Sequence, residues 1–445
     1  MQTTKWGGTA DNCFRASGFF RVDERDGVFW LVDPDGGRFL SKGVNTVRFD
    51  QDHVGIAGRV PYADTCREKY GSQHIWRVAA ANRLAGWKFN TLGCWSDELV
   101  AGAGLSRLAT APTIDLGASF RLHRRDESFP DVFDPVFSSH VRASAENLCM
   151  KRRNDVGLLG RFIDNELYWS PDWRGTDELL TLFLNLPSHR PGRLAAIARL
   201  QERYREFSQF NAVWSTPARS WEEFGAIGHV EAPFFRKPRE APAPAPEPGS
   251  PARAAFLADC DAFVAVVADQ YFELCVSAIR AADPNHLVLG SRFGYPPHPA
   301  VIAAAGRYLD VVSFNCYDFD PGPVIDAYAA SGKPCLISEF SFRSDDSGLP
   351  NSRGGGPRVA SQAERARCFE RYVAAALKKP AVVGYHWFEH ADQPAEGRFD
   401  GENSNFGTVT IEDEVYAELT ETMTRVNAAA EQIHAKAATA DRPSS

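Results

Sequence analysis

The chain has 445 residues, of which 44% are hydrophobic and 24% are charged, and its formal net charge is −8. This is the composition of a globular protein, and it argues against wholesale disorder. The negative charge argues against nucleic-acid binding, because binding to phosphates needs a basic surface. The sequence contains no run of 18 consecutive apolar residues, so we expect no membrane-spanning helix and no membrane partner.

The cysteines and the first residues bear on where the protein works. Nine cysteines are scattered along the chain without CxxC pairs, and the N-terminal segment MQTTKWGGTADNCFRASG has no apolar core of signal-peptide length. An unclustered set of this kind is typical of reduced thiols in a cytoplasmic protein. We therefore expect a cytoplasmic location.

The first predicted element is a β segment. Residues 18–40 alternate apolar and polar side chains, with turn signals at Asp26-Gly27 and in DPDGG at 33–37. This pattern predicts a β-hairpin or small meander. We expect residues 1–38 to form an N-terminal β segment that packs on the main domain.

From residue 39 onward, short apolar strands alternate with helical periods. The predicted helices lie at 72–86, within 135–154, and at 193–210, 254–282, 324–330, 361–378 and 414–435. The eight predicted strands are 39–46, 88–95, 112–117, 158–165, 286–291, 309–316, 334–340 and 381–388. Eight strands that alternate with helices predict an α/β fold, and the count favours a (β/α)8 TIM barrel over residues 39–436. We expect residues 437–445 to form a disordered tail.

A long insertion follows the fourth predicted strand. It spans 171–251 and ends in a Pro/Ala-rich loop at 237–251, which should be extended or disordered. The sequence leaves open whether this insertion is a lid over a site, a surface excursion or a subunit contact.

Polar side chains stand at the ends of most predicted strands. In a TIM barrel the carboxyl ends of the strands form the face that carries the site. The candidates for substrate binding at these ends are Asn45, Arg48, Trp95, Asn165, Arg292, Asn315, Tyr317, His386, Trp387 and Glu389.

Two of the strands end on a carboxylate that could do chemistry. Glu166 follows the fourth strand and Glu339 the seventh, roughly across the barrel mouth. Such a pair supports glycoside hydrolysis, and a retaining mechanism needs about 5 Å between the carboxyl groups. Burial and the neighbouring negative charge should raise the pKa of the acid. The nucleophile must stay ionised, and the candidate donors are Tyr317, Arg292 and Arg48.

A further acid, Asp164, lies two residues before Glu166. We expect Asp164 to face the barrel interior and to form hydrogen bonds with neighbouring strands.

Three segments resemble known enzymes: GFFRV…VFWLVDPDGGRFLSKGVNT, GRFIDNELYW and GYHWFEHADQPAEGRFDGENSNFG. The Asn165-Glu166 pair after the fourth strand and the isolated Glu339 after the seventh resemble clan A glycoside hydrolases. Within that clan the three segments most resemble the β-agarase family (glycoside hydrolase family 50) and related β-galactosidase-like enzymes. The resemblance implies that Glu166 is the acid/base and Glu339 the nucleophile. It also implies that Asn165 binds the 2-hydroxyl of the sugar and that Trp387 is the platform beneath the reacting ring.

The last of these segments contains a polar, glycine-rich stretch at 391–407, which should curl over the site. Its candidate contacts with sugar hydroxyls are Asp392 and Gln393, together with Arg398, Asp400, Glu402 and Asn403. We expect a retaining, exo-acting enzyme on imported galactose-containing oligosaccharides, with no cofactor. Whether the chain forms a homo-oligomer stays open.

Two other interpretations remain. His386, Glu389 and His390 could hold a metal, as in a metal-dependent sugar isomerase or lyase on the same barrel. On a strand, however, the two histidines would face one way and Glu389 the other, which suits a chelate poorly, so we expect no metal site. The second of these interpretations is a sugar-binding barrel that has lost its catalytic activity.

Overall fold

The computed structural model describes residues 2–10, 14–122, 124, 128–235 and 249–437, so most of the 237–251 loop and of the predicted tail lies outside the described residues. The chain has an α/β fold built on a parallel sheet. Six strands pair side by side in the order β6-β5-β4-β13-β10-β9, and every pair is parallel. They are β4 (Ser41–Val44), β5 (Thr91–Leu92), β6 (Ala109–Thr110), β9 (Val312–Asn315), β10 (Cys335–Phe340) and β13 (Val382–Trp387).

Two further strands form a separate parallel pair, β7 (Gly160–Arg161) with β8 (Leu287–Val288). Isolated parallel bridges connect this pair to both edges of the larger sheet. Thr110 bridges to Leu158 and Thr113 to Phe162 on one side, and Phe293 bridges to Phe314 on the other. Backbone pairing thus connects the six-stranded sheet to the β7–β8 pair at both of its edges.

The third predicted strand, 112–117, is wrong in its position. Strand β6 comes earlier, and Leu116 begins helix α3 (Leu116–Leu122). The backbone turns at Asp115, whose φ is 49°, and the Asp164 carboxylate accepts hydrogen bonds from the backbone N–H groups of Gly117 (2.7 Å) and Ala118 (2.8 Å). A carboxylate from a distant strand therefore stabilises the first turn of a short helix, which local sequence pattern could not indicate.

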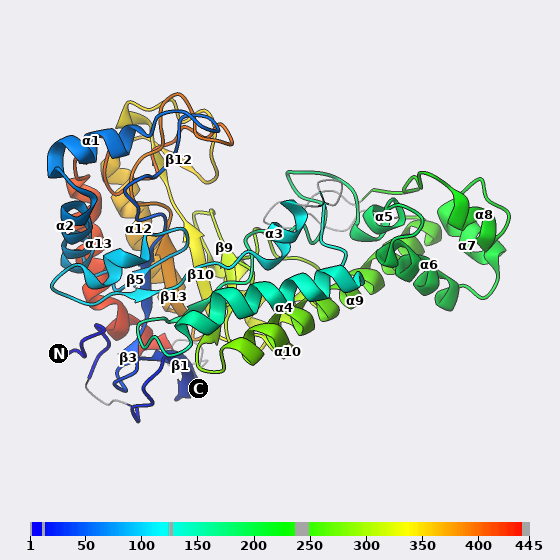
Figure 1. Cartoon of the computed structure of the whole chain (residues 1–445), viewed down its shortest axis with the longest axis horizontal. Coiled ribbons are helices and arrows are strands. Elements are labelled where there is room, and N and C mark those ends of the chain that lie inside the picture. Colours follow the sequence, from blue (N-terminus) through cyan, green and yellow to red (C-terminus); the bar gives the residue numbers. More distant parts are fainter. Residues whose placement is uncertain (1, 11–13, 123, 125–127, 236–248, 438–445) are drawn as a thin grey trace, which may run out of the picture.

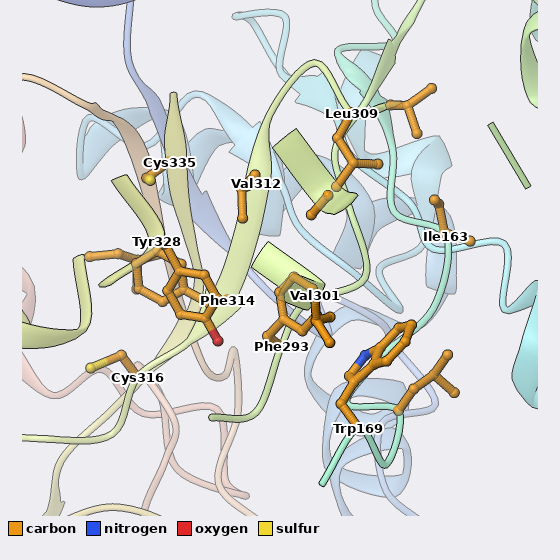
Figure 2. Packing of buried hydrophobic residues seen from close by; sticks show 14 of the residues in the cluster. Ile163, Trp169, Phe293, Val301, Leu309, Val312, Phe314, Cys316, Tyr328 and Cys335 are labelled. Carbon is orange, nitrogen blue, oxygen red and sulfur yellow. The ribbon is translucent and has the colours of Figure 1, made fainter. Parts of the chain in front are cut away.

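Helices alternate with the strands and pack on the sheet. They include α1 (Pro61–Tyr70), α2 (Gln73–Gly86), α4 (Pro135–Cys149), α10 (Pro299–Tyr308), α11 (Gly322–Ala329), α12 (Gln362–Leu377) and α13 (Ala417–His434). Figure 2 shows how one of them meets the sheet: Tyr328 of α11 stacks on Phe314 of β9, with ring centroids 4.4 Å apart and planes 8° apart, and also on Phe293. Aromatic stacking of this kind fixes the helix against the strand that carries site residues.

The N-terminal segment packs at the opposite end of the strands from the site. Strand β1 (Arg21–Arg25) pairs antiparallel with β2 (Val28–Val32), and β2 pairs with β3 (Arg38–Phe39). Trp6 and Phe20 belong to a hydrophobic cluster with residues from the beginnings of strands, such as Leu336 and Val383. This cluster buries apolar surface beneath the sheet and leaves the carboxyl ends of the strands open.

The insertion after β7 is helical and extends away from the sheet (Figure 1). It contains α5 (Leu179–Leu184), α6 (Pro191–Arg203), α7 (Phe207–Trp214) and α8 (Trp221–Ala226), so the predicted single helix at 193–210 is two helices. Helix α9 (Pro251–Ala282) runs back from them to the sheet. By length and composition α9 could cross a membrane, but it packs against α4 and α10 in the protein core.

We predict that a buried ion pair between β7 and the end of α9 is important for stability. The Arg161 guanidinium bonds to the Asp283 carboxylate, and both side chains are almost fully buried; His286 Nδ1 lies 2.8 Å from the same carboxylate. Arg161→Ala leaves a buried charge poorly compensated, so the free energy of unfolding should fall by about 3 kcal/mol. Denaturant unfolding measures the change.

The matched control is Arg199→Ala in α6, where the partner Glu202 and Arg199 are both more than half exposed. That substitution should change the free energy of unfolding by less than about 1 kcal/mol. Equal effects of the two substitutions would contradict the importance of the buried pair.

Candidate active site

A cavity of about 1130 Å³ opens where the strands end. Its wall combines many polar groups with several aromatic rings. The polar lining residues are Thr46, Arg48, Asp50, Asp52, His53, Asn165, Glu166, Asn315, Asp318, Glu339, Arg398, Asp400 and Glu402, and the rings are Trp95, Trp173, Tyr295, Tyr317, Phe388, Phe399 and Phe406. Both predicted catalytic carboxylates are in this wall. A large cavity with convergent polar groups is the usual form of a small-molecule site.

Glu166 follows β7 and is held by its backbone as well as its side chain. Its φ is 47°, its N–H donates to the Arg292 carbonyl (3.1 Å), and its own carbonyl accepts a hydrogen bond from the Arg174 guanidinium. Its Oε1 accepts a hydrogen bond from Asn315 Nδ2 at 2.8 Å. Burial, and next the negative charge of Glu339, raise the pKa of Glu166 to about 7. The carboxyl can therefore hold a proton near neutral pH.

Glu339, in β10, lies in a different environment. Arg292 Nη2 donates to its Oε1 at 2.5 Å, and the Tyr317 hydroxyl donates to its Oε2 at 2.7 Å. The Arg292 side chain is fully buried, and its guanidinium lies 4.5 Å from the centroid of the Trp95 ring. Both oxygens of Glu339 thus accept a hydrogen bond, and one of the two donors is a cation.

Asn315 connects the two carboxylates. It is the register partner of Glu339 in the neighbouring strand β9, while its amide donates to Glu166. The Ser338 hydroxyl donates to Asn315 Oδ1 at 2.8 Å and so fixes which way the amide points. Asn165 also belongs to this group, because its Oδ1 lies 3.3 Å from the same Asn315 nitrogen.

This arrangement presents two carboxyl groups in opposed environments to the same space. Two like groups with opposed environments can act as a proton donor and a nucleophile, respectively. The two environments differ because Arg292 and Tyr317 bond to Glu339 and not to Glu166.

Arg48 lies in the cavity wall but does not support Glu339 as predicted. Its guanidinium pairs with Asp50 through two hydrogen bonds, at 2.9 and 2.8 Å. Both side chains are at the exposed rim, so Arg48 is available to the cavity mouth and not to its floor.

Asn45, Arg292 and His386 lie behind the cavity wall and do not line it. Asn45 Nδ2 donates to the Ser338 carbonyl (2.9 Å), and its Oδ1 accepts from the Cys94 N–H (2.9 Å). His386 Nε2 lies 2.8 Å from the Ser41 hydroxyl, and burial, followed by the charge of Arg292, lowers the pKa of this histidine to about 3. These side chains connect strands, and the direct sugar contacts predicted for them are not supported by their positions.

Trp387 is also buried, and the platform role predicted for it is wrong in this structure. Its ring packs against Phe340 and Phe369, and its Nε1 donates to the Phe406 carbonyl at 2.9 Å. Side chains alternate along a strand, so the next residue, Phe388, reaches the cavity wall instead.

Three predicted contact residues do not line the cavity: Glu389, Asp392 and Gln393. Their side chains form hydrogen bonds that hold the 391–407 segment in place. Gln393 Nε2 donates to Glu389 Oε1 (3.1 Å) and to Glu402 Oε2 (3.0 Å), while Asp392 accepts from the Tyr416 hydroxyl (2.6 Å). The segment therefore does reach the site, but through Arg398, Phe399, Asp400 and Glu402.

Arg398 is the centre of a polar cluster in this wall. Its guanidinium lies 2.7 Å from Glu402, 3.0 Å from Asp400, 3.8 Å from Asp52 and 3.9 Å from Glu389. Burial raises the pKa of Asp52, and it raises the pKa of Glu389 well above the usual range of a glutamate.

Sequence reasoning missed several lining residues, among them Asp50, Asp52, His53, Gly294 and Tyr295. A signal was present, because each lies a few residues beyond a predicted strand end, where loops of this fold carry site residues.

The two histidines proposed as metal ligands do not meet. His386 bonds to Ser41, whereas His390 lies against Tyr62, with Nε2 3.3 Å from the hydroxyl. Over the ranges that the structure describes, no group of three or more His, Cys, Asp or Glu side chains is arranged to hold a metal ion.

Asp164 faces the helices α3 and α9, so the prediction that it would face the barrel interior is wrong. Besides its bonds to α3, it accepts from the Tyr271 hydroxyl of α9 at 2.5 Å, and burial raises its pKa to about 7. The left-handed backbone at Glu166 lets the chain direct Asp164 to the helix layer and Glu166 to the cavity.

Comparison with known proteins finds relatives over nearly the whole chain. β-Agarase B of Vibrio sp. (strain JT0107) is 28% identical over 95% of this chain and 49% of its own, and β-agarase A of the same organism is 28% identical over 94% and 46%. The chain thus spans about half the length of these relatives. The solved structure of an exo-β-agarase superposes with a TM-score of 0.79 at 24% identity, covering 97% of this chain and 68% of that one. No family model matches the sequence.

The like charge of Glu339 should be measurable in the titration of Glu166. In Glu339→Gln the repulsion is removed while the charge of Arg292 stays, so the pKa of Glu166 should fall by roughly one pH unit. Carbon-13 NMR of glutamate-labelled protein measures it, with Glu166→Gln to assign the signal. Glu370→Gln, on the exposed face of α12, is the control and should leave the titration unchanged. An unchanged Glu166 titration in Glu339→Gln would show that the two carboxylates do not interact.

Proposed function

We propose that the protein is a retaining β-glycoside hydrolase in which Glu166 is the acid/base and Glu339 the nucleophile. The observation that carries this proposal is the pair of carboxyl groups in one cavity wall with opposed environments. Glu166 is buried and has a raised pKa, whereas Glu339 accepts hydrogen bonds from Arg292 and Tyr317. The relatives named β-agarase support the same reaction class.

The reaction takes two steps. In the first, a Glu339 oxygen forms a bond to the anomeric carbon while the bond to the glycosidic oxygen breaks, and Glu166 gives its proton to that oxygen. In the second, Glu166 takes a proton from water, the water oxygen bonds to the anomeric carbon, and Glu339 leaves as the free carboxylate. The configuration is inverted twice and so retained.

The electrostatics of the site suit this alternation. Formation of the covalent bond removes the negative charge of Glu339, which is one cause of the raised pKa of Glu166. The pKa of Glu166 then falls, so the residue that was an acid in the first step becomes a base in the second. The Arg292 and Tyr317 donors stabilise the carboxylate that departs at the end.

The proposal includes a closed (β/α)8 barrel of the clan A type. Its support is the series of parallel bridges that joins the β7–β8 pair to both edges of the six-stranded sheet. Closure would bring the ends of β7 and β10, which carry Glu166 and Glu339, to one mouth. In the same proposal, residues 39–436 form the catalytic domain, residues 1–38 pack on it as a β segment, and 171–251 is an insertion.

The proposed substrates are galactose-containing, agarose-like oligosaccharides, attacked from a chain end. The names of the β-agarase relatives and of the exo-β-agarase structure support this choice. A cytoplasmic location, where imported oligosaccharides would be met, completes the proposal. The eight cysteines within the described residues are all buried and form no disulfide there, as expected in a reducing compartment.

Replacing the nucleophile should abolish turnover. Glu339→Gln keeps the shape of the side chain but cannot form the glycosyl ester, so kcat on agarose-derived oligosaccharides should fall by at least about 10³-fold. Glu370→Gln should retain full activity. Proton NMR of the first product formed by the wild type should show the β anomer. An α product would contradict the role of Glu339 as nucleophile.

Replacing the acid should matter most for poor leaving groups. Glu166→Ala should lower kcat/KM on oligosaccharides by about 10²- to 10⁴-fold. On β-galactosyl fluoride the loss should be much smaller, because fluoride leaves without being protonated. The wild-type kcat/KM on oligosaccharides should also fall as pH rises through the pKa of Glu166, about 7, since only protonated Glu166 can act. Equal losses on both substrates, or a rate that rises above this pH, would contradict the acid role.

A further inference from the structure

Two exposed aromatic rings stand in the cavity wall beside Glu166. Trp173 is 57% exposed and Tyr295 is 41% exposed, although large rings of this kind are usually buried. Their centroids are 5.2 Å apart, with planes at 64°. Neither ring is used in the two chemical steps described above.

Gly294 shows how close Trp173 lies to the acid. A Cβ placed on Gly294 would be 3.1 Å from Cη2 of Trp173 and 3.3 Å from the carboxyl carbon of Glu166. The indole ring and the carboxyl group therefore rest against the same side of one residue. The lack of a side chain at Gly294 leaves room for both.

Arg174 fixes Trp173 relative to Glu166 from the other direction. Its guanidinium bonds to the Glu166 carbonyl, lies 4.5 Å from the centroid of the Trp173 ring and pairs with Asp172. One short segment thus connects the backbone of the acid to the position of the ring. Such support limits the freedom that the ring would lose when a ligand packs on it.

The two rings are also set apart from the polar cluster around Arg398. Trp173 and Tyr295 follow β7 and β8, which pair with each other. Asp52 and Arg398 follow β4 and β13, which pair in the middle of the other sheet. The cavity therefore has the two exposed rings Trp173 and Tyr295 on the side of Glu166, whereas other strands contribute the charged cluster, in which Arg398 lies against Phe388 and Phe399.

The position of an acid indicates where the leaving group lies. Glu166 gives its proton to the oxygen that departs with the released saccharide, so that saccharide must sit next to Glu166. The C–H face of a pyranose is apolar, and an indole ring offers a flat apolar surface against which to bury it.

We propose that Trp173 and Tyr295 form the subsite for the leaving saccharide, with Trp173 as the ring on which a neutral sugar packs. This inference rests on the proposed function and adds to it the side of the cavity on which each part of the substrate binds. It also gives the insertion a role, since Trp173 stands at its beginning. Trp173 is then a specificity residue for the released part of the substrate.

The test compares substrates with and without a leaving saccharide. In Trp173→Ala, kcat/KM on agarose-derived oligosaccharides should fall about tenfold, the scale expected for loss of one aromatic contact. On β-galactosyl fluoride, kcat/KM should stay within about threefold of the wild type. Trp173→Phe should recover most of the loss. Phe235→Ala, which removes a similarly exposed ring outside the cavity wall, is the matched control and should change neither value.

A second measurement does not depend on how much of the variant is folded. With β-galactosyl fluoride as donor and an agarose-derived oligosaccharide as acceptor, the acceptor must bind where the leaving saccharide was. The ratio of glycosyl transfer to hydrolysis should therefore fall in Trp173→Ala and return in Trp173→Phe.

A loss on oligosaccharides with an unchanged transfer ratio would assign Trp173 to support of Glu166, whose replacement also spares the fluoride, and would overturn the subsite. Equal losses on both substrates would overturn it as well, because a leaving-group subsite does not act on the fluoride. No loss on either substrate would also overturn it. If the wild type turned over neither substrate, the proposed function itself would fail, and the leaving-group subsite with it.

Discussion

The chemistry of the site depends on one buried ion pair, between the guanidinium of Arg292 and the carboxylate of Glu339. A fully buried cation is costly unless it is paired, and here its partner is the carboxylate that faces the cavity. The same cation packs on Trp95, and after burial its charge is the second cause of the lowered pKa of the neighbouring His386. Glu339 is thereby oriented, and its negative charge is the second cause, after burial, of the raised pKa of Glu166. In the proposed mechanism, two chemically identical side chains take opposite roles because one arginine bonds to Glu339 and not to Glu166.

The backbone contributes to this separation of roles. The left-handed conformation at Glu166 and at Arg292 redirects the chain where β7 and β8 give way to loops, and the Glu166 N–H bonds to the Arg292 carbonyl. Unusual backbone conformations of this kind persist where the surrounding structure enforces them, and they concentrate at functional sites. Asp164, two residues earlier, bonds instead to α3 and α9 and thus anchors the strand that presents the acid.

Much of this could be predicted from the sequence, and the failures have physical causes. Strand ends that finish on Asn-Glu or Ser-Glu are conspicuous because a buried strand rarely keeps such groups without a purpose. Glu166 and Glu339 were therefore predicted to lie at one site, and both line the cavity. The local sequence pattern does not determine how deeply a side chain is buried. Trp387 and His386 were expected in the cavity but lie behind its wall, because neighbouring strands and Phe388 decide which ring is exposed. Contacts between distant segments, such as those of Asp164 with α3, cannot be predicted from sequence periodicity either.

In the proposed mechanism an oxygen of Glu339 bonds to the anomeric carbon, and trapping that glycosyl-enzyme tests this step most directly. A 2-deoxy-2-fluoro-β-galactosyl fluoride slows both steps but keeps its good leaving group, so the glycosyl-enzyme should accumulate. Mass spectrometry of the intact protein should then show the addition of one fluorosugar, and peptide mapping should place it on Glu339 in the segment CLISEF. A fluorosugar attached to any other residue, or turnover of ordinary oligosaccharides with inversion and no adduct, would contradict the account.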